Sequence, residues 1–466
     1  MDFNTILKSH QLIAKNFIET RPAAGLFLDC GAGKTLSTLA SLYELNEPYH
    51  ILVVAPKAIA VSTWKKEIKK WGDIFPYTSL IVNEKDKNYS TKIRHQLYQN
   101  VLDCSKATVF SINRENFVDL VLHLPENQYG QRVWPFGTVV FDELQSFKSH
   151  TSQRMKALQT VRPYMNRVIG LTGTPTPNGL MDLWGEIYAL DQGARLGQTI
   201  TAYRNTFFYP IKYIKNRPVD WAPLPGAKEE IYRRISDIIV SIDTDGLDLP
   251  DLIVNDISVH LSPAERKLYD RLRIDKVLEF DDVTITAKQA AGLQQKLSQL
   301  ASGALYVSKD SKEYIKVHEE KLDICEYIID NTSSPVLIAY HFKSDLDMLQ
   351  ERFPYGVQIT TSSQIQDDWN AGKIPLAFIQ PKSCGLGLNL QSGPGHTLVW
   401  YTLDFNYEDY YQMNKRLYRP GQTMPVTIHR LITENTIDER VAKALERKEA
   451  NEQELIDAVK WALQTN

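Results

Sequence analysis

The sequence predicts the α/β fold class, with two doubly wound parallel-sheet lobes that carry helical insertions. Buried β-branched runs alternate with helical patterns over residues 1–190, and the same alternation resumes after residue 335. A chain of 466 residues is also too long for one core and suits two or three domains. We therefore expect a first lobe over 1–190, a mainly helical insert and connector over 191–250, and a second lobe over 251–466. The second lobe is expected to include a helical insertion at about 262–310 and a C-terminal helix.

Composition narrows the class of protein. The formal net charge is −3, so a nucleic-acid surface would have to be a local basic patch. Four cysteines (Cys30, Cys104, Cys325 and Cys384) lie far apart without metal-ligand spacing, which fits a reducing compartment. The first residues lack a signal-peptide pattern, and no apolar run is long enough to span a bilayer. We expect a cytoplasmic protein without a membrane partner.

The stretch LFLDCGAGKT is the first candidate site. An apolar run ends in Gly31, Gly33, Lys34 and Thr35, and a helical pattern follows. Glycines let backbone N–H groups approach phosphate, the lysine reaches the β/γ-phosphates, and the threonine can ligate Mg²⁺. The full GxxxxGK[ST] pattern is not met, because Leu28 stands in place of the first glycine. Considered alone, the stretch fits either a nucleotide site or an ordinary glycine turn.

A glutamine shortly before this loop has two interpretations. Residues 7–20 form an amphipathic helical pattern, and Gln11 lies just before its apolar face. The side chain is either a solvated residue at the helix start or, given the loop that follows, a reader of an adenine edge through its amide.

Polar residues follow two further strand patterns. The run HILVVA is a doubly buried strand that ends near Lys57, and TVFSIN carries Ser111 and Asn113 at its end. Ligand sites in α/β sheets lie at the carboxyl ends of strands. Lys57 could contact a DNA backbone there, although a lysine-rich solvated helix face is an equally simple explanation for the basic residues nearby.

A pair of acids forms the second candidate site. The buried run in VVFDELQSFKS delivers Asp142 and Glu143 to a strand end. In a phosphate-binding protein, Asp142 would hold Mg²⁺ and Glu143 would accept a proton from the attacking water. The next core strand, RVIGL, ends in Thr172, Gly173 and Thr174, a polar turn that could sense the γ-phosphate.

The insert and the second lobe supply further candidates. In the insert, aromatic residues near Lys212, Lys215 and Arg217 could stack on bases, but packing in a small helical subdomain is the expected role. The second lobe contains the glycine-rich turn SCGLGLNL and the segment QMNKRLYRPGQ. The latter places Arg416 and Arg419 on one helical face, either as a surface salt-bridge row or as groups that stabilise charge on a transferred phosphoryl.

These stretches, in this order, resemble a superfamily-two nucleic-acid motor of the Swi/Snf type, over almost the whole chain. The most specific pieces are DCGAGKT, VVFDELQSFKS, LTGTPTPNGLMDLW, CGLGLNL and RLYRPGQ. The resemblance implies two RecA-like lobes, ATP and Mg²⁺ as cofactors, and DNA, duplex or branched, as a partner bound without sequence preference.

The resemblance also implies roles for individual residues. The residues expected at the nucleotide are Gln11, Gly31, Gly33, Lys34, Thr35 and Gly387, with Thr35 and Asp142 at Mg²⁺. Catalysis is assigned to Lys34, Asp142, Glu143 and the arginine fingers Arg416 and Arg419. Coupling of hydrolysis to movement is assigned to Gln145, Thr172, Gly173 and Thr174. The DNA groove is expected at Lys57, Ser111, Asn113, His341, Ser383 and Gly385.

The chain departs from the family pattern in two places. Leu144-Gln145 stands where the family usually has Ala-His, so Gln145 must take over or alter a coupling role. Asp404-Phe405-Asn406-Tyr407 replaces the usual Asp-Trp-Asn-Pro. The compact size resembles bacterial or phage members, which implies the cytoplasm of a bacterium or an infected host.

The predicted function is an ATP-dependent DNA helicase or translocase, acting on forks and junctions in replication, recombination or repair. One alternative is a translocase that tracks on duplex without separating strands. Two others are a P-loop kinase, whose turnover would ignore DNA, and a non-catalytic ATP-gated DNA clamp.

Overall fold

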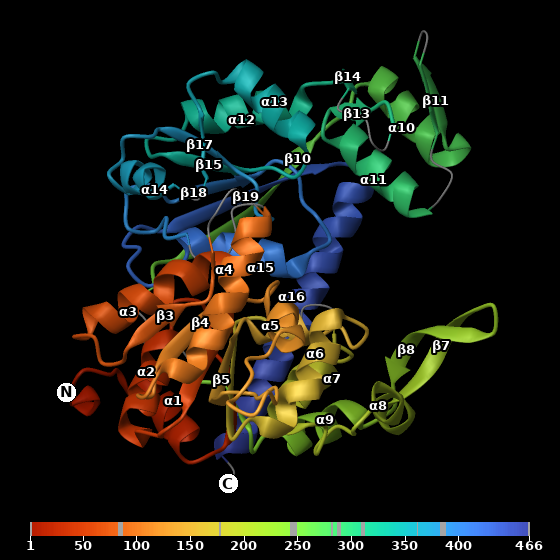
Figure 1. The fold of residues 1–466 in the computed structure, drawn as a ribbon. Coiled ribbons are helices and arrows are strands. Elements are labelled where there is room, and N and C mark those ends of the chain that lie inside the picture. Colours follow the sequence, from red (N-terminus) through yellow and green to blue (C-terminus); the bar gives the residue numbers. More distant parts are fainter. Residues whose placement is uncertain are drawn as a thin grey trace. The chain divides into compact units, whose positions relative to one another are not determined.

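The computed structural model describes residues 2–82, 87–176, 179–242, 249–280, 283–286, 290–308, 313–360, 362–382 and 388–464. The chain divides into two compact units. The first consists of Met1–Leu247 and Ala450–Asn466, and the second of Asp248–Glu449. Each unit contains one large parallel sheet flanked by helices (Figure 1), which confirms the predicted fold class.

The first unit is built on a seven-stranded sheet with the order β3-β4-β2-β5-β6-β1-β9. Every neighbouring pair in it is parallel. Its strands are β1 (Ala23–Phe27), β2 (His50–Ala55), β3 (Tyr77–Ser79), β4 (Val109–Asn113), β5 (Phe136–Asp142), β6 (Arg167–Thr172) and β9 (Ile239–Val240). Because all strands run the same way, the carboxyl ends of β1, β5 and β6 lie at the same sheet edge, and the predicted site residues follow them.

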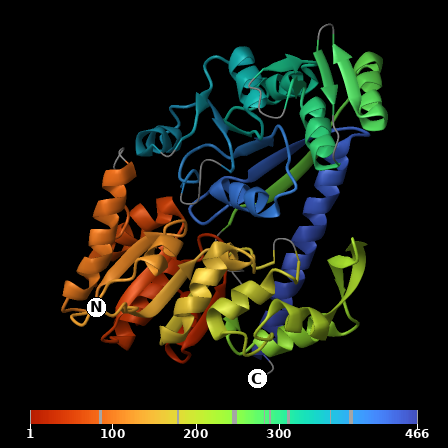
Figure 2. The same cartoon turned by 45° about the vertical axis from the view of Figure 1, so that its right-hand side comes forward.

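Helices cover both faces of this sheet. Along β2, Ile51 and Val53 pack into one hydrophobic cluster, whereas Leu52 and Val54 pack into another. The first cluster is closed by α1 (Ser9–Glu19), α2 (Lys34–Leu45) and α3 (Trp64–Lys70). The second is closed by α4 (Lys87–Gln99), α5 (Phe117–Leu122), α6 (Gln153–Val161), α7 (Leu183–Asp191), α8 (Ile200–Phe207) and α9 (Ala227–Ile235). Figure 2 gives a second view of these layers.

The segment predicted as a mainly helical insert is more mixed than its sequence indicated. Between α8 and α9 the chain forms an antiparallel ribbon of β7 (Phe208–Ile214) and β8 (Arg217–Pro223). After α9, the two residues of β9 pair parallel with β1 and extend the first sheet. Residues 191–247 therefore belong to the first compact unit.

The second unit has a six-stranded parallel sheet with the order β10-β19-β18-β15-β17-β16. Its strands are β10 (Leu252–Val259), β15 (Val336–Ala339), β16 (Val357–Gln358), β17 (Leu376–Ile379), β18 (Thr397–Trp400) and β19 (Val426–Thr433). Side chains alternate between two clusters here as well: Val336 and Ile338 of β15 face one, and Leu337 and Ala339 face the other. The sheet is thus doubly wound.

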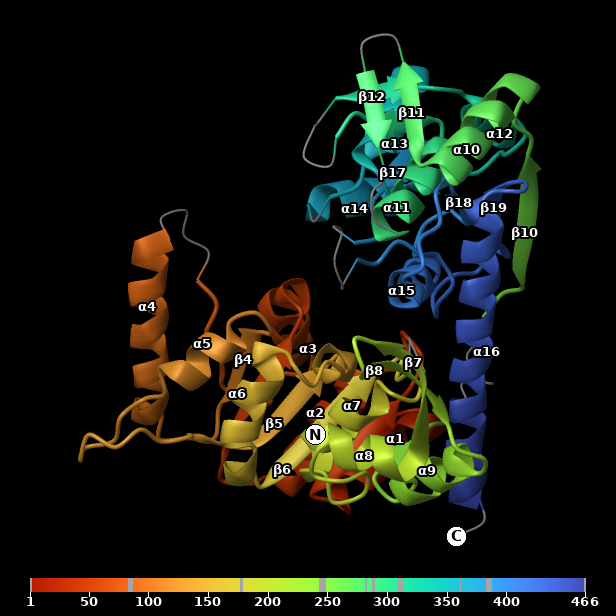
Figure 3. The ribbon, with the colours of Figure 1, turned by 90° about the vertical axis from the view of Figure 1, so that its right-hand side faces the viewer.

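The described helices of the second unit are α10 (Pro263–Asp275), α11 (Ala290–Ala301), α12 (Glu320–Asp330), α13 (Lys343–Arg352), α14 (Ser363–Asn370), α15 (Tyr407–Leu417) and the first part of α16 (Ile437–Gln464). From Ala450 onward, α16 belongs to the first unit. The insertion expected to be helical over 262–310 begins with α10, which Ser262 caps. A ribbon of β11 (Val277–Phe280) and β12 (Val283–Thr286) then separates α10 from α11, and β11 lies beside α10 (Figure 3). A short pair, β13 (Ala304–Tyr306) and β14 (Tyr314–Lys316), follows α11. Among the described residues, no helix carries an apolar stretch long enough to cross a membrane.

Candidate active site

The glycine loop after β1 has the backbone of a phosphate-binding turn. Gly31 and Gly33 both adopt positive φ, at 85° and 82°, a region that L side chains rarely occupy. Gly33 is the N-cap of α2, so the helix begins at Lys34. The first backbone N–H groups of a helix have no acceptor within it and can bind an anion.

Lys34 lies folded over this loop. Its Nζ donates hydrogen bonds to the backbone oxygens of Leu28 at 2.7 Å and Asp29 at 3.1 Å. Thr35, in the first turn of α2, is half-buried. An ammonium held by two neutral carbonyls gives up little when a phosphate replaces them, so Lys34 is free to take its predicted role, and the Mg²⁺ role of Thr35 stays a prediction.

Gln11 lies against the same loop. Its Oε1 accepts the backbone N–H of Lys8 at 3.0 Å and so caps α1, while its Nε2 lies 3.4 Å from the oxygen of Ala32. A Cβ added at Gly33 would meet Gln11 Nε2 at 2.0 Å, so the glycine is required for this close approach. The neighbouring His10 also contacts the Ala32 oxygen, through Nε2 at 3.1 Å. The side chain therefore caps a helix and lines the loop, and its contact with adenine stays a prediction.

The acid pair lies at the end of β5. Asp142 is buried and accepts a hydrogen bond from Trp64 Nε1 at 2.8 Å. The pKa of Asp142 is raised to about 6, mainly by burial and also by the charge of Glu143, while the Trp64 bond and the charge of Lys34 oppose the rise. The two carboxyl groups offer oxygen ligands that suit a divalent cation, and the Lys34 ammonium suits a phosphate. The residues present therefore fit Mg²⁺ together with a nucleotide phosphate.

A chain of hydrogen bonds runs from this acid pair to the end of β6. Glu143, whose φ is +67°, accepts from Gln145 Nε2 at 2.6 Å. Gln145 Oε1 accepts from Thr172 Oγ1 at 2.8 Å, and Thr172 Oγ1 accepts from the backbone N–H of Thr174 at 3.1 Å. The structure thus brings together Gln145, Thr172 and Thr174, with Gly173 between the two threonines. Gln145, which stands where the family usually has histidine, is the central residue of this series of hydrogen bonds.

The three residues of the first unit predicted in a DNA groove differ in their surroundings. Lys57 is exposed after β2. Ser111 has no exposed surface, and its hydroxyl bonds to the oxygen of Ala60 at 2.8 Å and to Tyr77 at 2.7 Å. Asn113 is buried and donates to Glu115 at 2.9 Å. The predicted DNA contact of Ser111 is therefore corrected: this residue lies in the middle of β4, and its hydroxyl bonds to a π-helical turn, Ile59–Thr63, that packs on the strand.

In the second unit, Arg416 and Arg419 both reach the last residues of the glycine-rich stretch SCGLGLNL. Arg416 Nη1 donates to the oxygen of Leu388 at 3.1 Å, and Arg419 Nη1 donates to Asn389 Oδ1 at 3.0 Å. The prediction that they share a helical face is wrong, because α15 ends at Leu417 and Arg419 lies beyond it. Ser383, Gly385 and Gly387 lie outside the described residues.

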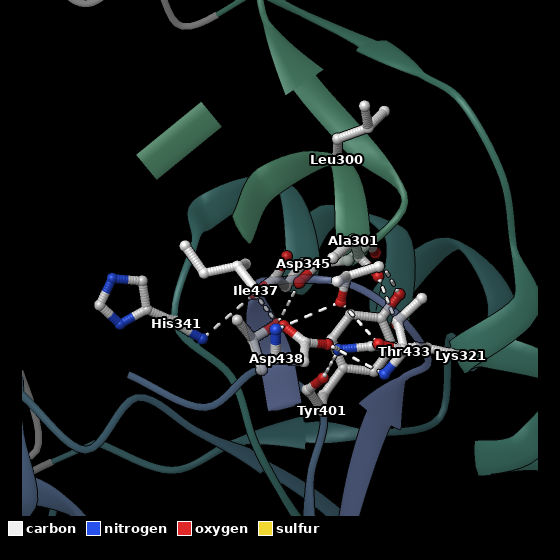
Figure 4. A network of polar contacts seen from close by, with 12 residues as sticks. Leu300, Ala301, Lys321, His341, Asp345, Tyr401, Thr433, Ile437 and Asp438 are labelled. Carbon is white, nitrogen blue, oxygen red and sulfur yellow. Dashed lines mark hydrogen bonds and ion pairs between the residues drawn. The ribbon is translucent and has the colours of Figure 1, made fainter. Parts of the chain in front are cut away.

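His341 follows β15 and lies at the side of a buried polar network (Figure 4). Its backbone N–H donates to Asp345 Oδ2 at 3.2 Å, while its imidazole points away from the network. Asp345 Oδ2 also accepts from the Phe342 N–H at 2.9 Å and from Thr402 Oγ1 at 3.0 Å. Thr402 in turn bonds to Ser302 at 2.8 Å. The residue predicted at the DNA groove is thereby joined to the end of α11.

An ion pair lies in the same network. Lys321 Nζ donates to Asp438 Oδ2 at 2.7 Å and to the backbone oxygen of Tyr401 at 2.9 Å. Asp438 Oδ2 also accepts the N–H of Thr433, at 3.2 Å. Lys321 and Asp438 are 0% and 1% exposed, so the pair is withdrawn from water and joins α12 to the start of α16.

Asp345 predicts a pH dependence of stability. Burial raises the pKa of Asp345 from its ordinary 3.8 to about 6, so the folded unit binds this proton more tightly than the unfolded chain does. The resulting stabilisation is complete below about pH 4 and is lost as the pH rises through about 6. In urea unfolding across this range, the wild type should lose stability relative to Asp345→Asn, which cannot titrate. Glu351→Gln, on the exposed side of α13, is the control, and a pH-independent difference for Asp345→Asn would contradict the assignment.

One contact at the site was not anticipated from the sequence. Trp64 is buried at the start of α3, and its indole N–H donates to the Asp142 carboxylate. The two residues are 78 positions apart, and a buried tryptophan needs a partner for its N–H. From the sequence, the need of a buried indole N–H for an acceptor was the only signal of this contact, and it does not identify the acceptor.

Comparison with known proteins places the chain in a family. Residues 18–312 match the SNF2-related domain. Protein p41 of Acyrthosiphon pisum secondary endosymbiont phage 1 is 34% identical, over 97% of this chain and 98% of its own length. CHROMATIN REMODELING 19 of Arabidopsis thaliana is 23% identical over 96% of this chain and 68% of its own length.

Two further relatives extend the comparison. Bacillus subtilis YwqA, named as an ATP-dependent helicase/translocase, is 23% identical over 98% of this chain and 50% of its own length. A solved structure, the Sulfolobus solfataricus SWI2/SNF2 ATPase core in complex with dsDNA, aligns with a TM-score of 0.42 at 20% identity, over 98% of this chain and 94% of that one. The domain match and the phage relative show that this chain belongs to the SNF2-related family.

Proposed function

We propose that the chain is a DNA-dependent ATPase that couples ATP hydrolysis to movement along DNA. The observation that carries the proposal is the cluster of Lys34, Asp142 and Glu143 at one edge of the first sheet, in a chain of the SNF2-related family. Named relatives of this family include helicases and translocases. The proposal extends that activity to this chain.

Each residue of the site has a proposed task. Gly31, Gly33 and the start of α2 bind the phosphates, with Lys34 as their cationic partner. Thr35 and Asp142 hold Mg²⁺, which when bound neutralises phosphate charge. Glu143 accepts the proton of the attacking water, and Gln145 orients it.

The remaining proposed tasks lie elsewhere in the chain. Gln11 contacts the adenine from its place beside the loop. Arg416 and Arg419 stabilise negative charge on the transferred phosphoryl, which requires them to leave the oxygens of Leu388 and Asn389. Gly387 is proposed to contact the nucleotide by family resemblance. Lys57, Asn113, His341, Ser383 and Gly385 are proposed to line the DNA path, without sequence preference.

The hydrogen-bond chain from Glu143 to Thr174 is the proposed coupling device. Replacing Thr172 with valine removes a hydroxyl that both donates to Gln145 and accepts from Thr174, at nearly constant volume. We expect the DNA-stimulated kcat to fall about tenfold, since an unmade buried hydrogen bond costs about 1–3 kcal/mol. Steady-state ATPase rates measure the effect.

Thr138→Val is the matched control for this prediction. Thr138 is also a buried threonine of the sheet, and its hydroxyl donates to Glu47 at 3.0 Å near the start of β5. Its replacement should change kcat less than about twofold. Equal losses in the two variants would show that Thr172 acts on stability alone.

The finer proposal is that the motor remodels branched DNA, such as forks and junctions. The alternative of tracking on duplex without strand separation requires no strand-splitting element. The two predicted insertions each contain a two-stranded ribbon, β7–β8 and β11–β12, and a ribbon of this kind can act as a strand-splitting element, which supports the branched-DNA proposal.

ATPase rates without DNA and with single strands, linear duplex, forks and four-way junctions test the proposal, with Lys34→Ala as control. Strongest stimulation by forks or junctions supports branched-DNA remodelling. Equal stimulation by plain duplex favours the tracking translocase. An ATPase rate that stays the same with every DNA would contradict the proposed motor function and favour a P-loop kinase.

A further inference from the structure

The β7–β8 ribbon is an unusually exposed part of the first unit. It joins α8 to α9 and extends away from α8 (Figures 1 and 3). Its turn is Lys215-Asn216, and both residues have positive φ, at 48° and 60°. Two positive φ values form the tight turn that matches the twist of an antiparallel pair.

The base of the ribbon is firmly anchored. Phe208 is 5% exposed, and its ring lies 5.1 Å from that of Tyr203 in the core. On β8, the Trp221 ring lies 5.5 Å from the guanidinium of Arg204. The Leu224 N–H then donates to the oxygen of Phe207 at 2.9 Å. The ribbon is therefore held in position at one end only.

Beyond its base the ribbon exposes large side chains. Every residue from 211 to 220 is exposed. Tyr209 and Tyr213 are 47% and 59% exposed, and Ile211, Ile214 and Val219 are also exposed. An isolated two-stranded ribbon is only marginally stable, and contiguous exposed apolar groups mark an interaction surface. Packing within a helical subdomain, the role expected for these aromatics, is not what Tyr209 and Tyr213 do.

The charge of the ribbon selects the kind of partner. It carries Lys212, Lys215 and Arg217 against one acid, Asp220, in a chain whose net charge is −3. A local excess of cations beside exposed aromatic rings complements a polyanion with flat groups. Single-stranded nucleic acid has both features, with phosphates for the cations and free base faces for the tyrosines.

We propose that the β7–β8 ribbon binds an unpaired strand of the DNA on which the motor acts. Tyr209 and Tyr213 stack on bases, while Lys212, Lys215 and Arg217 contact phosphates. Duplex does not satisfy this surface, because its base faces are covered by stacking and only its backbone would be reached. The proposal rests on the proposed function, and it assigns the ribbon to the unpaired arm of a branched substrate.

The test compares the full chain with the double variant Tyr209→Ala/Tyr213→Ala. Fluorescence anisotropy measures Kd for a labelled strand of about 20 nucleotides and for the matching duplex. We expect Kd for the single strand to rise at least about tenfold, since base–aromatic stacking is worth about that much per base or more. Kd for duplex and duplex-stimulated ATPase should stay within about twofold.

Two further variants guard against a trivial loss. Tyr129→Ala removes a tyrosine that is 77% exposed elsewhere in the first unit and should change neither Kd. Tyr209→Phe/Tyr213→Phe keeps both ring faces and should retain single-strand binding. Failure of the phenylalanine variant to bind would show that stacking is not the interaction.

The remaining outcomes separate this proposal from the proposed function. Unchanged single-strand binding in the alanine variant overturns the ribbon proposal. The proposal is also overturned if light scattering shows a lower particle mass for the alanine variant while its Kd for the single strand is unchanged. In that case the ribbon joins copies of the chain. Single-strand binding can depend on the ribbon while no DNA changes the ATPase rate. That result would support the ribbon proposal and contradict the proposal that the chain is a DNA-driven motor.

Discussion

Replacing Glu143 with glutamine is expected to lower the DNA-stimulated kcat by about 10²–10⁴-fold, the contribution typical of a positioned general base. Glutamine keeps the length of the side chain and can still accept the hydrogen bond that Gln145 donates. It cannot take a proton from water. Nucleotide affinity should stay within about threefold, so the loss will be confined to turnover and will be visible in steady-state ATPase rates.

Glu115→Gln is a suitable control for this prediction. Glu115 follows β4, at the same edge of the first sheet, and it accepts a hydrogen bond from Asn113 at 2.9 Å. Its replacement should leave kcat within about twofold. A loss below about tenfold for Glu143→Gln would remove Glu143 from the role of base, and an unchanged rate would favour the non-catalytic clamp.

Replacing Lys321 with methionine is expected to destabilise the second unit by about 3–5 kcal/mol, the cost of leaving a buried charge without its partner. Lys321 is 0% exposed and supplies the cation that Asp438 contacts at 2.7 Å. Methionine fills a similar volume, so the loss reports the uncompensated carboxylate rather than a cavity. Urea unfolding followed by tryptophan fluorescence measures the change.

Lys316→Met tests whether burial is the cause. Lys316 also forms ion pairs, with Glu319 and with Glu351, but its side chain is 35% exposed. Solvent-exposed pairs contribute little, so this variant should lose no more than about 1 kcal/mol. Similar losses in both variants would mean that burial does not set the strength of the Lys321 pair.

The two lobes could be predicted because their strands are long, apolar and separated by helical patterns. In β2 and β15 every residue is apolar or nearly so, which is typical of strands buried on both faces. Short elements gave no such signal. The strand β9 has two residues, and its place beside β1 depends on contacts far along the chain.

The ribbons were missed for a different reason. The turn of β7–β8 is Lys215-Asn216, whereas the sequence signal for a two-residue hairpin is Asn-Gly or Asp-Gly. Pairing between the strands also shifts at Pro210 and Lys212, which breaks the alternation by which strands are recognised. Without a clear strand run, the segment was assigned to a mainly helical insert.

Site residues were predictable where a motif fixes the local backbone. Gly33 and Lys34 follow from the turn that starts α2, and Asp142 from the end of β5. Arg419 was wrongly placed in a helix, since Pro420 disfavours helical backbone in the residue before it. The burial of Ser111 depends on a segment some fifty residues earlier in the chain, which no local pattern reveals.

The central claim is that ATP hydrolysis drives this chain along DNA, and displacement of a third strand from a DNA triplex tests it most directly. In this assay a motor that tracks on duplex removes the third strand whether or not it separates the duplex. We predict displacement that requires ATP, fails with a non-hydrolysable analogue, and is abolished by Lys34→Ala. DNA-stimulated hydrolysis by the wild type without any displacement would contradict the claim.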